Sequence, residues 1–135
     1  MPTATGSARR ALHQACLCAK VCDDLRGENT KVLDLTAVTP VFDYFVVTNG
    51  TNRRQMVAIG DKADDVMAAA GSERLGMEGQ EGATWILHDY GDVVLHIFDP
   101  ETRRTYDLEN LWADAKSIDW REALNLAGET ETSNG

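Results

Sequence analysis

The residues best able to do chemistry lie between positions 85 and 98, where carboxylates and histidines interrupt two apolar runs. Asp89 and Asp92 flank the short turn between the runs, and two such carboxylates can hold Mg²⁺ or transfer protons. Aspartates beside a tight turn more often accept hydrogen bonds from nearby backbone N–H groups. His88 and His96 are expected on opposite faces of the paired runs, so they should not bind one metal ion together. We predict neither catalysis nor a metal site in this stretch.

Two other groups of residues could hold a metal ion. Asp107 and Glu109 are close in sequence, and Cys16, Cys18 and Cys22 lie within seven residues. Cys18 and Cys22 are four residues apart, so a helix would bring their thiols to one face. There is no Cys-x-x-Cys pair, and small buried cysteines are common in Ala-rich helices. We expect the cysteines to be free core residues.

The segment Asn49-Gly50-Thr51 stands where a strand is expected to lead into a helix, a junction that can cradle an anion. It lacks the patterns of a P-loop or of a dinucleotide-binding turn. Arg53 and Arg54 in the first helical turn interact unfavourably with the helix dipole. Their presence is explained either by a functional role or by ion pairs with an acidic surface. A nucleotide-using transferase therefore stays open as an alternative function, although no cofactor is predicted.

A β-hairpin is expected to position the groups between 85 and 98. Gly91-Asp92 separates two runs rich in β-formers, and a glycine that opens a two-residue loop suits a type II′ turn. The register expected for this turn pairs Tyr90 with Val93, His88 with Leu95 and Ile86 with Ile97 on one face, and Trp85 with Phe98, Leu87 with His96 and Asp89 with Val94 on the other. Both faces are mainly apolar, so each must be covered by helices of this chain or by another protein.

The remaining sequence predicts helices flanking a mixed sheet. A 3.6-residue apolar period follows Ser7 and stops before Gly27, and a second helix is capped by Asn52 and ends at Gly71. Strands are expected over 32–38 and 44–48, a Gly-rich connection over 71–82, a turn or the start of a short helix at 99–101, and another short helix over 106–112. These elements predict one compact α/β domain over 7–120, with a disordered stretch over 1–6 and a largely disordered polar tail over 121–135.

The acidic composition narrows the kinds of partner. The chain has 135 residues, 22 of them acidic and 13 basic, and a formal net charge of -9. Nucleic-acid binders replace counterions with Lys and Arg, so little direct contact with nucleic acid is expected. An acidic surface is better matched to a basic protein, unless the charge serves only solubility. No apolar run reaches the ~20 residues of a membrane span, and the N-terminus lacks the features of a secretory signal, so we expect a soluble, cytoplasmic protein.

Several motifs follow one another in a recognisable order. Residues 43–47 read Asp-Tyr-Phe-Val-Val, 49–55 read Asn-Gly-Thr-Asn-Arg-Arg-Gln, and Glu78-Gly79 follows. The hairpin then contains Trp-x-x-x-Asp-Tyr-Gly-Asp, and residues 106–112 read Tyr-Asp-Leu-Glu-Asn-Leu-Trp. Together these motifs, spread over residues 7–119, resemble the Iojap-like ribosomal silencing factor family.

The resemblance implies a ribosome-binding protein that is not an enzyme. Members of that family bind the fourteenth protein of the large ribosomal subunit, at the face that meets the small subunit, and thereby block subunit joining and lower translation. The resemblance also implies a fold akin to nucleotidyltransferases and a homodimer when the protein is free. An assembly factor that binds precursors of the large subunit would use the same surface, so this alternative stays open.

The resemblance also indicates where the ribosomal protein binds, because the family's Trp-x-x-x-Asp-Tyr-Gly-Asp segment falls on the hairpin. The partner-binding residues implied in this way are Trp85, Leu87, Asp89, Tyr90 and Asp92, with Glu78 and Tyr106 as weaker candidates. An apolar, aromatic centre with an acidic rim agrees with the inference drawn from charge, since it suits a basic ribosomal protein.

Overall fold

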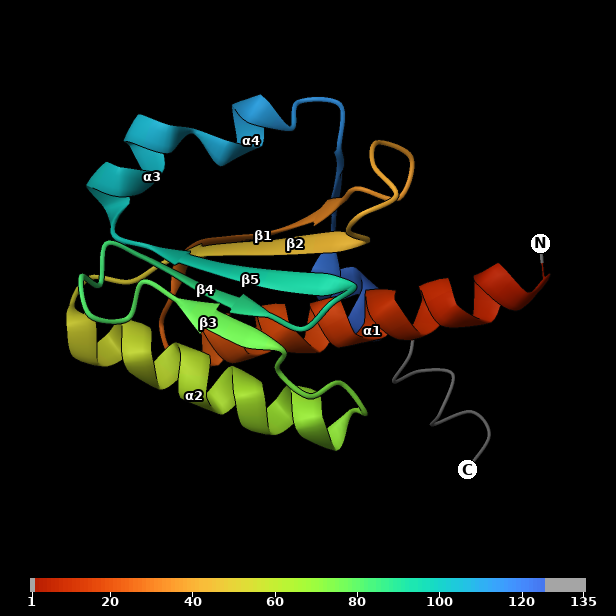
Figure 1. Ribbon diagram of the computed structural model, residues 1–135, viewed down its shortest axis with the longest axis horizontal. Helices are drawn as coiled ribbons and strands as arrows, with labels where there is room; N and C mark the ends of the chain where they lie inside the picture. Colours follow the sequence, from red (N-terminus) through yellow and green to blue (C-terminus); the bar gives the residue numbers. More distant parts are fainter. Residues whose placement is uncertain (1, 126–135) are drawn as a thin grey trace.

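Two long helices cover one face of a six-stranded sheet, and two short helices lie over part of the other face (Figure 1). This computed structural model describes residues 2–125. The helices are α1 (Pro2–Asp24), α2 (Arg53–Ala69), α3 (Pro100–Tyr106) and α4 (Leu108–Leu111), and the strands are β1 (Glu28–Asp34), β2 (Tyr44–Asn49), β3 (Gly76–Glu78), β4 (Trp85–Asp89), β5 (Val93–Phe98) and β6 (Lys116–Ile118). Within residues 2–125, no helix combines the length and the apolar character needed to cross a membrane.

The sheet is mixed, as the sequence predicts. Its strand order is β3-β4-β5-β2-β1-β6, with β2 and β5 parallel and every other neighbouring pair antiparallel. The α/β fold class is therefore confirmed. The short edge strands β3 and β6 were not predicted, because three residues are too few to give a recognisable alternation.

The predicted hairpin register is confirmed in every pair between β4 and β5. Trp85 lies opposite Phe98, Leu87 opposite His96 and Asp89 opposite Val94, with Ile86 and His88 opposite Ile97 and Leu95. The backbone N–H of Tyr90 donates to the Val93 carbonyl at 2.9 Å, which closes the turn. Gly91 has a φ of 93°, a left-handed value that favours glycine at the first position of this turn.

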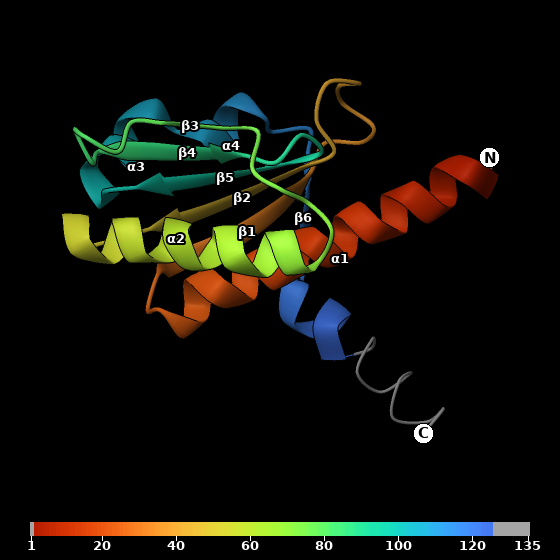
Figure 2. The same cartoon turned by 60° about the horizontal axis from the view of Figure 1, so that its bottom comes forward.

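The sheet face against α1 and α2 (Figure 2), here called the inner face, carries the larger apolar core. Helix α2 contributes Met56, Ile59, Ala63 and Met67 at helical spacing. Gly60 lets this helix approach β4 closely, because a Cβ at that position would overlap the His88 ring. The cysteines are free and buried in α1, as expected.

Local hydrogen bonds explain where several elements begin and end. The N-cap of α2 is Asn52, whose side chain accepts from the Gln55 N–H at 2.9 Å, as predicted. Strand β1 ends at Asp34 rather than at residue 38, because the Asp34 carboxylate accepts from the Thr36 N–H at 2.9 Å and turns the chain. Helix α1 begins at Pro2, five residues before the predicted start at Ser7.

The C-terminal part of the chain is structured beyond the predicted boundary at residue 120. Residues 120–125 are helical, and Trp120 is buried in the core under the inner face. Ala123 and Leu124 pack against the same core, which explains why this segment folds instead of joining a disordered tail. The rest of the predicted tail, 126–135, lies outside the described residues.

Candidate docking surface

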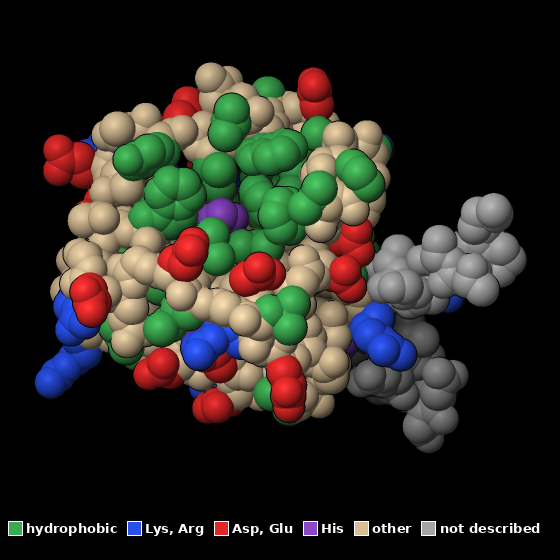
Figure 3. Space-filling model, viewed as in Figure 1, with side chains coloured by type: hydrophobic (Ala, Val, Ile, Leu, Met, Phe, Trp, Pro, Cys, Tyr) green, Lys and Arg blue, Asp and Glu red, His purple; other side chains and the backbone are tan. Residues whose placement is uncertain are grey.

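The sheet face opposite α1 and α2, here called the outer face, is apolar and only partly covered. Leu33, Leu35, Phe45, Val47, Val94, Phe98 and Leu108 are buried there. Figure 3 shows a continuous region of hydrophobic side chains on this side of the molecule, with a histidine ring within it and acidic side chains around it. The short helices α3 and α4 cover one end of this face, so the remainder is open to a partner.

The open part of this face is defined by five half-buried or exposed side chains, which we call the outer apolar surface. Its members are Phe42, Trp85, Leu87, Tyr106 and Trp112. Trp85 stacks on Phe98 with ring centroids 4.9 Å apart and touches Tyr106 at 5.0 Å. Next to Trp112, Leu111 is 72% exposed. Large aromatic side chains of this kind are typical anchors of protein interfaces.

His96 lies at the floor of this surface and fixes the position of Trp85. The Trp85 Nε1–H donates to His96 Nδ1 at 3.1 Å. Because the indole nitrogen can only donate, Nδ1 must be the unprotonated acceptor and Nε2 must carry the proton. The ring is 3% exposed and packs edge-on against Phe45 at 4.5 Å. Burial lowers the pKa of His96 to about 3, so the imidazole is neutral at physiological pH.

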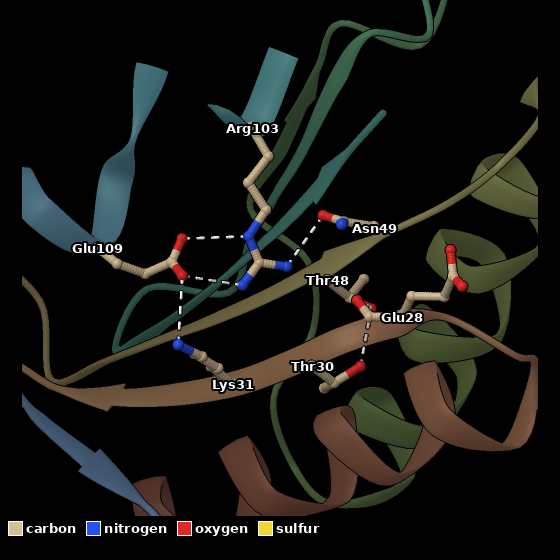
Figure 4. Close-up of polar contacts among 7 residues, drawn as sticks. All are labelled: Glu28, Thr30, Lys31, Thr48, Asn49, Arg103 and Glu109. Atoms are coloured by element: carbon tan, nitrogen blue, oxygen red, sulfur yellow. Dashed lines mark hydrogen bonds and ion pairs between the residues drawn. The ribbon is translucent and has the colours of Figure 1, made fainter. Parts of the chain in front are cut away.

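A buried arginine holds α3 and α4 onto the sheet (Figure 4). Arg103 donates to both carboxylate oxygens of Glu109 at 3.1 Å, and its third nitrogen donates to Asn49 Oδ1 at 2.9 Å. Lys31 approaches the same carboxylate at 3.5 Å. Burial alone would raise the pKa of Glu109, but the hydrogen bonds and charge of Arg103, with those of Lys31, bring it below its usual value.

This network also explains the Asn49-Gly50-Thr51 junction that the sequence offered as an anion cradle. A hollow of about 400 Å³ lies beside it, lined by Lys31, Arg103 and Arg104 but also by Asp107 and Glu109. The Asn49 side chain is already bound to Arg103, and the Arg103 guanidinium is already paired. The junction therefore serves to join β2 to α3, and a specific anion contact is not needed to explain it.

Of the seven predicted partner-binding residues, five lie on the outer face and a sixth, Asp92, lies at its edge. Trp85, Leu87 and Asp89 alternate along β4 on this side, and Tyr106 packs on Trp85. Glu78 of β3 lies directly opposite Leu87 of β4, so it adds a carboxylate to the same face. Asp89 Oδ1 accepts from the Gly91 N–H at 2.8 Å, which is the backbone role expected of an aspartate near a turn.

Asp92 lies at the tip of the hairpin, beside other carboxylates. Its backbone carbonyl accepts from the N–H groups of Asp43 and Tyr44, and its side chain is exposed. Burial first, and then the negative charges of Asp92 and Asp34, raise the pKa of Asp43. This end of the sheet therefore concentrates negative charge at the edge of the outer apolar surface.

Tyr90 does not belong to this surface, which corrects the prediction for that residue. It lies one step along the alternation from Asp89, so its ring points to the inner face and is 5% exposed. Its hydroxyl donates to Asp64 Oδ1 at 2.7 Å, and His88 Nδ1 meets the same oxygen at 2.8 Å. Arg74 pairs with the other Asp64 oxygen at 2.6 Å. These contacts join β4 to α2 instead of leaving Tyr90 free for a partner.

Sequence reasoning missed one member of the outer apolar surface, Phe42, and also the residue at its floor, His96. Phe42 lies in the loop before β2, where no periodicity marks it. His96 was considered only as a metal ligand, although the predicted register already paired it with Leu87 beside Trp85. Among residues 2–125 no three metal-binding side chains cluster.

The comparisons with known proteins decide the family. The family model described as "Ribosomal silencing factor during starvation" matches residues 8–134. This chain belongs to that family. The Bacillus subtilis protein "Ribosomal silencing factor RsfS" is 38% identical over 109 residues, which are 81% of this chain and 92% of the relative.

Relatives of this chain extend beyond bacteria and include a solved structure. A crystal structure of a Chromobacterium violaceum protein is 34% identical, has a TM-score of 0.69, and matches over 72% of this chain and 81% of that chain. A mouse protein, "Mitochondrial assembly of ribosomal large subunit protein 1", is 34% identical over 112 residues, 78% of this chain and 48% of the mouse protein. The predicted likeness to nucleotidyltransferases is not tested by these relatives and stays a prediction.

Proposed function

We propose that this silencing factor binds the large ribosomal subunit through its outer apolar surface and blocks joining of the small subunit. The contact would be the fourteenth protein of the large subunit, at the face that meets the small subunit, in the cytoplasm. A factor and a small subunit that compete for one face cannot both occupy it. The extent of repression then depends on the concentration of the factor and on its affinity for the large subunit.

The observation that carries this proposal is the uncovered, aromatic part of the outer face. Monomeric proteins rarely leave a large continuous apolar patch open unless it binds a partner. Here Trp85, Tyr106 and Trp112 supply broad side chains that lose little entropy on binding. Their rim carries Glu78 and the carboxylates near Asp92, which favour a basic protein as partner.

The proposal is tested by co-sedimentation of the purified protein with separated large and small subunits. Leu111 and Leu75 form a matched pair, because they are 72% and 75% exposed and neither change should unfold the protein. Leu111 precedes Trp112 of the outer apolar surface in the sequence, whereas Leu75 comes just before β3, where continued alternation places it on the inner side with Met77.

We expect the wild-type protein to pellet with large subunits only. Leu111→Ser should weaken that binding by about threefold to tenfold, and Leu75→Ser should leave it unchanged. Absence of wild-type binding to the large subunit would overturn the proposal. Equal effects of the two substitutions on binding would exclude the outer apolar surface as the binding site for the large subunit.

The mouse relative's name supports one alternative, an assembly factor for the large subunit. Such a factor would bind precursors of the large subunit and leave mature subunits free. Co-sedimentation with mature subunits, followed by addition of small subunits, separates the two functions. A silencing factor lowers the yield of joined ribosomes in that assay, whereas an assembly factor does not change it.

The outer apolar surface also accounts for the homodimer that the family resemblance implies. Two copies facing each other would cover each other's aromatic side chains while no ribosome is bound. A dimer built in this way competes with the large subunit for the same surface. Leu111→Ser should then weaken self-association and ribosome binding together, as measured by analytical ultracentrifugation and co-sedimentation.

A further inference from the structure

One buried polar atom at the floor of the outer apolar surface has no partner. His96 Nε2 is shielded from solvent and makes no hydrogen bond within residues 2–125. The other ring nitrogen accepts the hydrogen bond from Trp85, so the proton must be on Nε2. The structure therefore holds an N–H donor, pointed into an aromatic environment, with nothing to accept from it.

A buried donor without an acceptor costs free energy, and most buried polar groups in proteins are paired. The rings around His96 are those of Phe45, Trp85 and Phe98, with centroids 4.5, 6.0 and 6.2 Å away. Such apolar walls are poorly suited to hold a water molecule, which needs several polar neighbours. A group from a partner molecule therefore fits the missing acceptor better than a trapped water molecule does.

The donor is also permanent under physiological conditions. Burial lowers the pKa of His96 to about 3, so the ring stays neutral near pH 7, and the hydrogen bond from Trp85 keeps its proton on Nε2. Leu87 lies directly opposite His96 across the hairpin and is only half-buried. A docking protein can thus reach the ring by moving side chains of the outer apolar surface, without any change in the sheet.

We propose that His96 Nε2–H donates a hydrogen bond to an oxygen atom of the ribosomal protein that docks on the outer apolar surface. This inference rests on the function proposed above and makes His96 a specificity-determining residue for it. Apolar contact alone would accept many hydrophobic partners. A buried donor selects the partner that brings an oxygen to the centre of the interface, because any other leaves the donor unpaired.

Two amide substitutions separate this role from the positioning of Trp85. In His96→Asn, the side-chain oxygen can take the place of Nδ1 and still accept from Trp85, but nothing replaces the Nε2–H. In His96→Gln, the longer side chain can bring an N–H to the place of Nε2, but it no longer offers an acceptor where Nδ1 was. Both variants keep a polar side chain of intermediate size, and thermal unfolding reports whether each one folds.

Binding to large subunits is then compared by co-sedimentation. We expect His96→Asn to lose affinity by about tenfold, because the partner's oxygen is left without a donor, while His96→Gln stays within about threefold of wild type. The opposite order would mean that His96 acts by holding Trp85, and would overturn the inference. Equal losses would mean that only ring packing matters, with the same consequence.

The failure of this inference can be told apart from failure of the proposed function. If wild-type protein binds and Leu111→Ser weakens binding, but His96→Asn binds as wild type does, the function stands and the role of His96 falls. If the wild-type protein does not bind large subunits at all, both fall together. Leu75→Ser serves as the control in each series, since Leu75 is exposed and the alternation continued from β3 places it on the inner side.

Discussion

Asp64 of α2 contacts three side chains, and these contacts hold α2 to the hairpin and to the segment that follows α2. Tyr90 and His88 meet one of its oxygens, at 2.7 and 2.8 Å, and Arg74 meets the other at 2.6 Å. Burial is the largest cause that raises the pKa of Tyr90, so its hydroxyl stays protonated and remains a donor. Tyr90 therefore stabilises the inner side of the fold.

We expect Tyr90→Phe to lower stability without affecting ribosome binding. The change removes one hydrogen bond to Asp64 while the ring stays packed, so the free energy of unfolding should fall by about 1 kcal/mol. Urea unfolding measures this loss, and co-sedimentation with large subunits should give wild-type affinity. A substantial fall in affinity at unchanged stability would show instead that Tyr90 contacts the partner.

The case of Tyr90 shows what the sequence reveals about single residues. Alternation along the hairpin correctly separates Trp85 from Tyr90, because neighbouring side chains of a strand point to opposite faces. Alternation does not say which face α1 and α2 cover when both faces are apolar. Because Trp85 and Tyr90 belong to one motif, both were predicted to bind the partner. Only Trp85 lies on the outer apolar surface.

The two short helices are held in place by a contact that no local sequence pattern predicts. Arg103 in α3 binds Glu109 in α4 and Asn49 at the end of β2, which is 54 residues away in the sequence. Short isolated helices are marginal in water, so α3 and α4 need this anchor and the buried Leu108. Their existence could be predicted from the sequence, but their place over the outer face could not.

Replacing Glu109 tests that anchor through its dependence on pH. Glu109→Gln removes a carboxylate that is paired with buried Arg103, and at pH 7 it should cost about 2 kcal/mol of stability. The pKa of Glu109 is lowered in the folded protein, so its stabilising effect is complete above the unfolded pKa and is lost as the pH falls through the folded one.

Urea unfolding of wild type and Glu109→Gln across the pH range measures this difference directly. The gap between the two proteins should be constant near neutrality and should close below the usual glutamate value of 4.5. Lys20→Met is a suitable control, because the Lys20–Asp24 pair is exposed on α1 and should contribute little at any pH. A gap that persists in acid would mean that Glu109 acts by packing instead of by charge.

At the scale of the whole molecule, the two faces of the sheet are covered unequally. Helices α1 and α2, together with the segment 120–125, cover the inner face, whereas only α3 and α4 lie on the outer face (Figures 1 and 2). The sequence predicted this need for a cover on both faces from the apolar hairpin alone. It could not say which face is left open, because that depends on long-range packing of α1 and of Trp120.

The net charge of -9 predicts how fast this surface should find a basic partner. Opposite charges steer association and are screened by salt, while the apolar contact that retains the partner is affected much less. Raising KCl from about 50 to 250 mM should slow association with the isolated, basic ribosomal protein by about threefold to tenfold and leave dissociation nearly unchanged. Surface plasmon resonance with that protein tethered, free of the negatively charged ribosomal RNA, measures both rates. Leu111→Ser should do the reverse, speeding dissociation at every salt concentration, since it removes apolar contact and no charge. A salt-independent association rate would show that the acidic rim does not guide binding.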